Sequence, residues 1–229
     1  MAIVFSPSNL MQWQTCPRKF WGQSISKLLK YKESAQKNRG MEVHTAIQNA
    51  LKYGFNRVTD WPAGLDIYYV QDIVEDVRKQ IADGAQLYIE HDLVVTDKFQ
   101  VAPGGFFDDN AYLRARADAV ILPPVGLPPY LVDIKTGKKW DNNDFQLRVE
   151  ALLAHLIYQR DVVNYAYWYV DYGETVDGSI DFRNGLGPVQ DIIDTMKQMG
   201  VDLKLQTFMP RKNKFCKWCD FNGTANCGL

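Results

Sequence analysis

The sequence predicts a mixed α/β fold, either one domain with an elaboration or two small domains that share a core. Its 229 residues are enough to bury a sizeable core. The 46% of hydrophobic and 13% of aromatic residues are typical of a packed globular chain. Apolar residues recur at helical spacing up to about residue 92. From there to about residue 200, segments with strand-like alternation are interspersed with segments of helical spacing.

We therefore expect three regions within one compact unit: a helical N-terminal region over 1–92, an α/β core over 93–200 and a cysteine-containing C-terminal region over 201–229. A first helical segment over 5–30 opens with a cap at Ser6, Pro7 and Ser8, and Pro17 breaks or restarts it. Two longer helices are expected over 36–53 and 65–91. The apolar stripe of the helix over 36–53 consists of Met41, His44, Ile47 and Leu51.

The core region begins with strand patterns that predict a three-strand meander. These strands are expected over 93–102, 111–122 and 131–135, with prolines between the last two. The elements expected after them are a helix over 144–158, a strand over 162–173, a short strand over 178–182 and a closing helix that ends at Gly200. The meander and the strands after it would supply the central sheet.

Net charge and hydropathy bear on whether the protein binds nucleic acid and whether it crosses a membrane. The formal net charge is −1, so a nucleic acid would have to be bound by local basic patches. The first residues lack a basic leader, and no apolar run approaches the roughly 18 residues of a membrane span. We expect a soluble cytoplasmic protein with no membrane partner. Its four cysteines would then be reduced or bound to metal.

The stretch LVDIKTGKK, residues 131–139, predicts the functional site. Alternation along a strand places Leu131, Asp133 and Lys135 on one face. A solvated strand with alternating charges gives the same pattern, but the apolar neighbours indicate burial, where an unpaired Asp and Lys would be unfavourable. A bound divalent cation would account for both charges.

The preceding strand pattern, YLRARADAVIL, has the same form. Leu113, Ala115, Ala117 and Ala119 are expected on one face, and Arg114, Arg116 and Asp118 on the other. If the two strands pair, Asp118, Asp133 and Lys135 converge into a site suited to phosphodiester hydrolysis. His44 is either a core histidine or a metal ligand, and Gln146 is either a surface residue or part of the site.

The cysteines predict a second metal site. Cys216 and Cys219 form a CxxC, Cys227 follows eight residues later, and Cys16 lies near the other end of the chain. Their surroundings are polar and rich in turn residues, unlike those of inert buried thiols. Four thiolates suit one tetrahedral zinc or one four-iron cluster. Such a metal would hold the two ends of the chain together.

Together these motifs match a known family. The chain resembles the RecB-like branch of the PD-(D/E)XK nuclease superfamily, and within it the iron–sulfur nucleases of the AddB type and the CRISPR-associated RecB-like exonucleases. The matching segments, in the family's order, are FSPSNLMQWQTCPRKF, RGMEVH, RARADAVI, LVDIKTGK, QL at Gln146 and the terminal CKWC. The resemblance implies a restriction-endonuclease-like core, a mixed central sheet flanked by helices, with a helical N-terminal elaboration and a C-terminus stapled by a metal cluster.

The resemblance also implies residue roles. His44, Asp118 and Asp133 would ligate one or two Mg²⁺ or Mn²⁺ ions, with the Ile134 carbonyl oxygen as a further ligand. Lys135 would position or activate the attacking water, and Gln146 would support the site. The ligands of a 4Fe–4S cluster would be Cys16, Cys216, Cys219 and Cys227. The chain departs from the family in having Glu150 where a tyrosine is usual, and in the longer spacing before Cys227, which leaves zinc as an alternative.

Four cations near the expected site form a DNA-binding hypothesis. Arg114 and Arg116 share the face of Asp118, and Lys138 and Lys139 follow the LVDIKTG stretch. We expect them to contact the phosphates that flank the scissile bond. The alternative is a solvated edge strand that carries its charges into water.

These observations predict a cation-dependent deoxyribonuclease, most simply an exonuclease on single-stranded DNA or duplex ends, of prokaryotic or viral origin. One alternative is a processing endonuclease that depends on recombination or CRISPR adaptation proteins. A second is a non-catalytic, metal-stapled DNA-binding module, and a third is RNA cleavage. An oligomer is compatible with the sequence.

Overall fold

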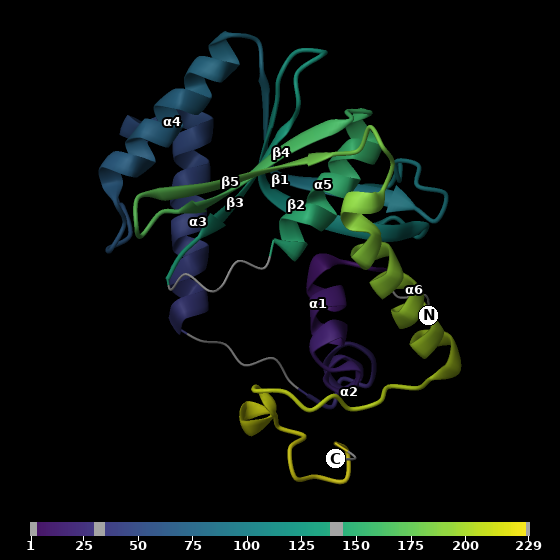
Figure 1. Ribbon diagram of the computed structural model, residues 1–229. Helices are drawn as coiled ribbons and strands as arrows, with labels where there is room; N and C mark the ends of the chain where they lie inside the picture. Colours follow the sequence, from purple (N-terminus) through teal and green to yellow (C-terminus); the bar gives the residue numbers. More distant parts are fainter. Residues whose placement is uncertain (1–3, 30–34, 138–143, 228–229) are drawn as a thin grey trace.

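The computed structural model describes residues 4–29, 35–137 and 144–227. Its centre is a five-stranded mixed sheet with helices on both faces, in agreement with the predicted α/β class (Figure 1). The strands follow the order β1(Gln86–Thr96), β2(Ala111–Leu122), β3(Tyr130–Lys135), β4(Val162–Tyr169) and β5(Glu174–Asp181). Neighbouring strands are antiparallel except for β3 and β4, which are parallel. The predicted meander is therefore formed by β1, β2 and β3.

Six α-helices surround the sheet in the described residues: α1(Pro7–Thr15), α2(Pro17–Phe20), α3(Ala35–Tyr53), α4(Ile67–Ala82), α5(Phe145–Tyr158) and α6(Gln190–Leu205). Helices α3 and α4 pack on one face of the sheet, whereas α1, α5 and α6 pack on the other. A parallel β3–β4 pair requires a crossover connection, and α5 provides it. Within the described residues, no helix is long and apolar enough to cross a membrane.

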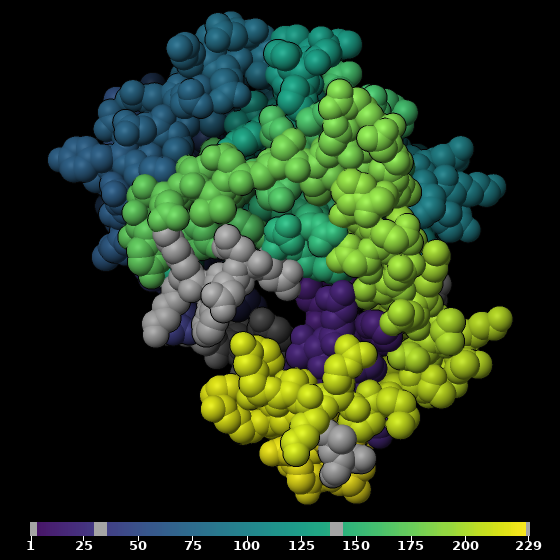
Figure 2. Space-filling model, viewed as in Figure 1, coloured from purple at the N-terminus to yellow at the C-terminus, as the bar shows by residue number. Residues whose placement is uncertain are grey.

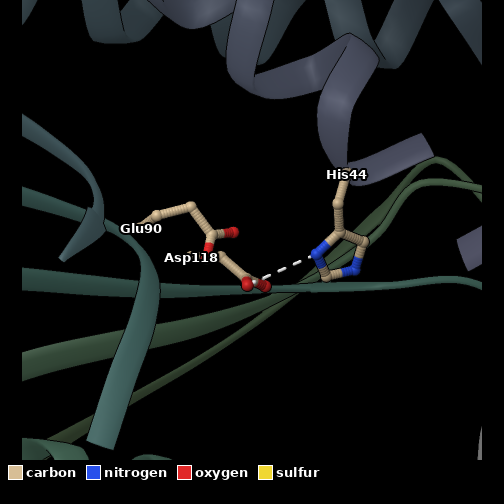
Figure 3. Close-up of side chains that lie close together, drawn as sticks. All are labelled: His44, Glu90 and Asp118. Carbon is tan, nitrogen blue, oxygen red and sulfur yellow. Dashed lines mark ion pairs between the residues drawn. The ribbon is translucent and has the colours of Figure 1, made fainter. Parts of the chain in front are cut away.

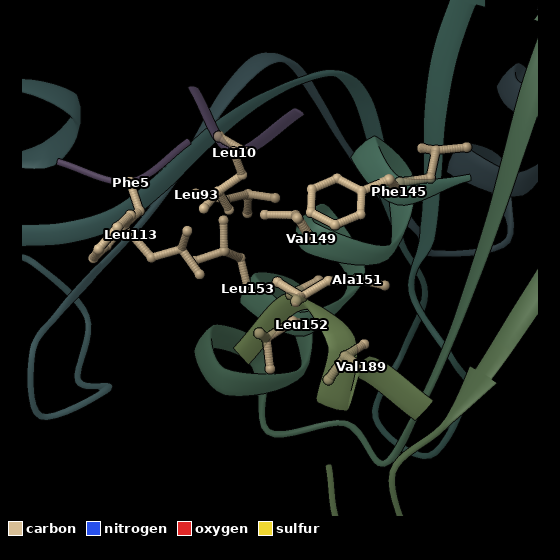
Figure 4. Close-up of a cluster of buried hydrophobic side chains, with 14 of the residues drawn as sticks. Phe5, Leu10, Leu93, Leu113, Phe145, Val149, Ala151, Leu152, Leu153 and Val189 are labelled. Atoms are coloured by element: carbon tan, nitrogen blue, oxygen red, sulfur yellow. The ribbon is translucent and has the colours of Figure 1, made fainter. Parts of the chain in front are cut away.

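The larger hydrophobic core lies on the α1, α5 and α6 face. Leu10 of α1, Leu93 of β1, Leu113 of β2 and Leu153 of α5 meet there, all with no exposed surface (Figure 4). Helix α5 contributes an almost continuous buried run, because it lies between the sheet and the N-terminal helices. This core holds the strands that carry the predicted site residues in a fixed position.

The N-terminal helices begin and break as predicted. The Ser6 hydroxyl accepts a hydrogen bond from the backbone N–H of Asn9 (3.3 Å) and caps α1. Cys16 is extended and separates α1 from α2, which starts at Pro17. Because both helices are anchored by buried residues, the position of the Cys16 thiol is set by the helix junction.

Several predicted boundaries were wrong. The helix expected to reach residue 91 ends at Ala82, because Gly84 adopts a left-handed conformation (φ +98°) and β1 starts at Gln86. The closing helix passes through Gly200 and ends at Leu205, where Gln206 takes the left-handed position. Met41, expected in an apolar stripe, is 54% exposed, and Val43 is buried in its place.

The predicted alternation along the second strand was also wrong at one point. Leu113, Ala115 and Ala117 pack into the core beside α1 and α5, but Ala119 packs on the opposite face with α3 and α4. Strand β1 changes face in the same place, since Leu93 packs with the first group and Ile89 with the second. The change falls at Glu90, whose backbone has φ +50°, and at the facing Asp118. Both carboxylates are therefore located at an irregularity shared by the two strands.

Candidate active site

The first group of site residues consists of His44, Glu90 and Asp118. His44 projects from α3, and the two carboxylates project from β1 and β2 toward its ring (Figure 3). One ligand atom from each residue can be chosen so that all three lie within 4.8 Å of one another. Two carboxylate oxygens and an imidazole nitrogen are suitable ligands for Mg²⁺ or Mn²⁺. The donor set therefore fits the cation that the sequence predicts.

Hydrogen bonds hold Asp118 in this position. Its Oδ1 lies 3.3 Å from His44 Nδ1, and its Oδ2 accepts the backbone N–H of Ile134 at 2.7 Å. Burial opposes a charge on the imidazole, but the hydrogen bond and negative charge of Asp118 outweigh it, so the pKa of His44 is raised. The same electrostatic attraction favours a bound cation.

Glu90 was missed by the sequence analysis because it lay within the expected helix over 65–91. Gln48 of α3 donates a hydrogen bond from Nε2 to Glu90 Oε1, which orients the carboxylate. A non-glycine residue at φ +50° is uncommon, and inside a strand it has a backbone cost that the surrounding contacts must offset. The sequence signal was a carboxylate at the position that faces Asp118 on the neighbouring strand. It can be recognised only once β1 is known to start at Gln86.

The second group is built around Asp133, which is 4% exposed. Lys135 Nζ lies 2.6 Å from Asp133 Oδ2, and Gln146 of α5 donates from Nε2 to Oδ1 at 2.7 Å. Burial raises the pKa of Asp133 to about 6, although the positive charge of Lys135 opposes this shift. The structure thus brings Asp133 and Lys135 together, as expected from their placement on one strand face, and α5 places Gln146 beside them.

Glu150 lies behind this group. Its Oε1 accepts a second hydrogen bond from Gln146 Nε2 at 3.0 Å, and its Oε2 is buried without a hydrogen-bond partner among the described residues. Burial, together with the negative charge of Asp133, holds the pKa of Glu150 well above its usual range. Glu150 is therefore a buried carboxyl whose neutral form is favoured.

The two groups adjoin through β3. Ile134, whose N–H binds Asp118, directly follows Asp133, and the negative charge of Asp133 contributes to the raised pKa of His44. The resulting site combines carboxylates and an imidazole with a lysine beside the buried carboxylate. The roles of these residues, and the Ile134 carbonyl as a ligand, stay predictions.

The predicted phosphate-binding arginines have protein partners. Arg116 Nε lies 2.7 Å from Asp92 Oδ1, and Arg114 donates from a terminal guanidinium nitrogen to the Phe106 carbonyl oxygen at 2.7 Å. Both guanidinium groups also lie over the Phe106 ring, at 4.3 Å for Arg114 and 4.6 Å for Arg116. Contacts of these arginines with DNA stay a prediction. Lys138 and Lys139 lie outside the described residues.

All four cysteines line one pocket, although Cys16 and Cys216 are separated by almost the whole chain. The backbone N–H of Arg211 donates to Cys16 Sγ (3.4 Å), and that of Asn213 donates to Cys216 Sγ (3.3 Å). Backbone donors aimed at sulfur stabilise thiolates, the form that binds metal. The cysteine pocket therefore gathers four possible sulfur ligands, two of which accept backbone hydrogen bonds.

Hydrogen bonds outside the thiols also join the two ends of the chain. Arg18 Nε donates to the Asn226 carbonyl oxygen (2.6 Å), and Asn213 Nδ2 donates to the Thr15 carbonyl oxygen (3.0 Å). Phe221 packs so closely on Gly22 that an added Cβ there would clash with its ring. The C-terminal segment is therefore fitted specifically to the N-terminal helices.

Comparisons with known proteins agree with this geometry. The model of the PD-(D/E)XK nuclease superfamily matches residues 4–224. No protein of curated function matches the chain. One similar solved structure is the crystal structure of SSO0001, with 15% identity over 97% of this chain and 96% of that chain and a TM-score of 0.38. A likeness at that score carries no argument, whereas the family match spans nearly the whole sequence. The chain therefore belongs to the PD-(D/E)XK nuclease superfamily.

Proposed function

We propose that this metal-dependent nuclease hydrolyses phosphodiester bonds in DNA, as an exonuclease that acts on single-stranded DNA or on duplex ends. The observation that carries the proposal is the convergence of His44, Glu90 and Asp118 ligand atoms within 4.8 Å, beside the buried Asp133–Lys135 pair. A surface cluster of acids would have no reason to include a buried carboxylate and a lysine held by α5.

The proposed roles follow from these contacts. The cation, Mg²⁺ or Mn²⁺, would be held by His44, Glu90, Asp118 and Asp133. When bound, it would lower the pKa of a water molecule and neutralise charge on the phosphate. Lys135 would orient the attacking water and stabilise negative charge on the phosphate oxygens. Gln146 would fix the direction of the Asp133 carboxylate through its 2.7 Å hydrogen bond.

The site itself supports an orienting role for Lys135 better than a proton-transfer role. Its Nζ lies 2.6 Å from Asp133 Oδ2, so the ammonium is held in one place by an ion pair with a proposed ligand of the cation. A charged lysine held in this way can direct a water or a phosphate oxygen without itself changing protonation.

We also propose that Cys16, Cys216, Cys219 and Cys227 hold a 4Fe–4S cluster, which would place the chain in the RecB-like iron–sulfur branch of the superfamily. The support is the shared pocket and the two N–H···S hydrogen bonds. Zinc is the alternative for the same ligands. Anaerobically purified protein should absorb visible light and contain iron, whereas colourless protein with one zinc would reject the iron assignment.

The nuclease proposal is tested with single-stranded DNA labelled separately at its two ends, in Mg²⁺ or Mn²⁺. Wild-type protein should cut, Asp133→Ala and Lys135→Ala should not, and the exposed Lys197→Ala should cut normally as the matched control. The product ladders distinguish exonuclease from endonuclease action. A matched RNA strand tests the substrate class. Absence of cleavage by folded, metal-loaded protein would reject independent nuclease activity.

A further inference from the structure

Half-buried and exposed side chains alternate regularly along the segment over residues 211–219. Asn213, Cys216 and Cys219 are half-buried, whereas the residues between them are exposed. This three-residue repeat coincides with a 3₁₀ turn over Cys216–Trp218, in which every third side chain lies on the same side. Arg211 and Phe215 line the cysteine pocket together with the thiols, although both are also exposed. The exposed residues outside its lining are Lys212, Lys214, Lys217 and Trp218.

Two pairs of a cation and an aromatic ring make up the exposed surface of this segment. Lys214 Nζ lies 5.4 Å from the centre of the Phe215 ring, and Lys217 Nζ lies 4.0 Å from that of Trp218. The two ring centroids are 6.4 Å apart. Phe215 is 44% exposed and Trp218 68% exposed. Large aromatic side chains gathered on a surface mark interaction sites more often than packing.

The charge of the surface indicates the partner. Residues 211–219 contain Arg211, Lys212, Lys214 and Lys217 and no acidic residue, in a chain whose net charge is −1. Lys19 lines the same cysteine pocket as Phe215 and adds a further cation. A basic patch on a slightly acidic protein attracts a polyanion locally. Exposed rings beside those cations fit unpaired bases, whose faces are accessible only in single strands.

We propose that the outward side of residues 211–219 binds the single-stranded part of the substrate. Bases stack on Phe215 and Trp218, and the neighbouring cations contact the phosphates. This inference rests on the proposed DNA nuclease function and adds a second contact region outside the acidic site. In Figure 2 the C-terminal part of the chain, in yellow, forms a projection at the lower end of the molecule.

The test measures binding without cleavage. Every protein is full-length, metal-loaded and carries Lys135→Ala, and the probe is a fluorescent single-stranded oligonucleotide followed by anisotropy. Trp218→Ala should weaken binding roughly tenfold, the effect of losing one stacked base, while Trp218→Phe retains most of the affinity. Tyr68→Ala is the matched control, because Tyr68 is 79% exposed on α4 and remote from the patch.

Salt dependence separates a phosphate contact from structural damage. Lys214→Gln and Lys217→Gln should each reduce the slope of log affinity against log salt concentration by about 0.7, the value for one phosphate contact on a single strand. Unchanged metal content and melting temperature confirm that the cysteine pocket is intact. Damage to the fold would lower affinity without this stepwise change in slope.

Equal affinities of Trp218→Ala and Tyr68→Ala, with unchanged salt slopes, would overturn the inference. An equal loss of affinity for a blunt duplex would overturn its single-strand character. The proposed function fails separately: patch-dependent binding by a wild-type protein that cuts no DNA would reject the nuclease assignment and leave this inference standing.

Discussion

The acidic site and the cysteine pocket are held by different means. The acidic site is built on α3, β1, β2, β3 and α5, which share two large hydrophobic cores. The cysteine pocket is formed mainly by turns, and among the described residues the hydrophobic cluster beside it has three buried members, Leu29, Phe221 and Cys227. A site on a packed sheet can tolerate buried carboxyl groups and strained backbone, whereas a region with so small a core needs a cross-link.

The unfavourable groups of the acidic site are visible in the structure. Asp133 and Glu150 are both buried carboxyls, and Glu90 has a left-handed backbone. Each would lower stability by itself, and each is retained next to the predicted cation position. The comparison predicts that substitutions in the acidic site change catalysis far more than folding, while those in the cysteine pocket do the reverse.

The largest expected effect is on catalysis, through Lys135. Lys135→Ala should lower kcat by about 10²–10⁴-fold, because the charge that orients the water and the phosphate is lost. The melting temperature should change little, since Asp133 can take up a proton when its counter-charge is removed. Single-turnover cleavage and thermal melting measure the two quantities. Normal cleavage by Lys135→Ala would contradict the assigned site.

The cysteine pocket should show the opposite pattern. Cys216→Ala should destabilise the protein by more than about 4 kcal/mol, a value typical of losing a structural metal, and should expose residues after Phe208 to proteases. Asn222→Ala, in the same pocket but without a thiol, is the matched control. If Cys216→Ala melts and resists proteolysis as the control does, the pocket holds no cross-linking metal.

Glu90 tests how many ligands the acidic site uses. Glu90→Gln should weaken Mn²⁺ binding by roughly 10–100-fold, because a carboxylate oxygen is replaced by a neutral amide, with little change in activity at saturating Mn²⁺. Calorimetric titration of the cation measures this effect. Gln48→Ala should give a smaller shift in the same direction, since it only orients Glu90. Unchanged affinity in both variants would remove Glu90 from the ligand set.

The pH dependence of stability and activity tests whether the buried Asp133 carboxylate destabilises the protein when no cation is bound. Its pKa is raised to about 6 in the folded protein, so the neutral form stabilises the fold at low pH and this contribution is lost as pH rises through about 6. Cation binding needs the carboxylate, so activity at limiting Mg²⁺ should fall below about pH 6. Excess Mg²⁺ should shift that fall to lower pH. A midpoint that does not respond to Mg²⁺ would contradict this account.

The smallest expected effect is at Glu150. Glu150→Gln keeps the shape and the hydrogen bond to Gln146 but removes the ionisable group, so the metal-free protein should gain on the order of 1 kcal/mol at neutral pH. The raised pKa of Glu150 gives the sign, because ionisation of the buried carboxyl destabilises the fold as pH rises. Denaturant unfolding at pH 5 and pH 8 measures the gain. A loss of stability at both values would contradict it.

Much of the fold could be predicted from local sequence patterns. The Ser6 cap, the break at Pro17, the helices α3 and α5 and the strands β2 and β3 follow from capping residues, prolines and apolar periodicity. The closing helix was misjudged because Gly200 is tolerated inside α6, where packing against the core outweighs its weak helix propensity. Helix ends depend on such tertiary contacts more than helix centres do.

The chemistry of the site was also present in the sequence: the Asp-x-Lys strand, the histidine helix and the cysteine spacing each indicated a ligand or catalytic group. Their assembly required long-range pairing. Glu90 lies beside His44 and Asp118 because β1 pairs with β2 and both strands change face at Glu90 and Asp118. Neither position is a glycine or a proline, so the sequence gives no local signal of this change. Cys16 lines one pocket with the C-terminal cysteines because α1 and α6 pack on the same core. Local residue patterns encode local conformation, whereas contacts between distant segments depend on how the whole core packs.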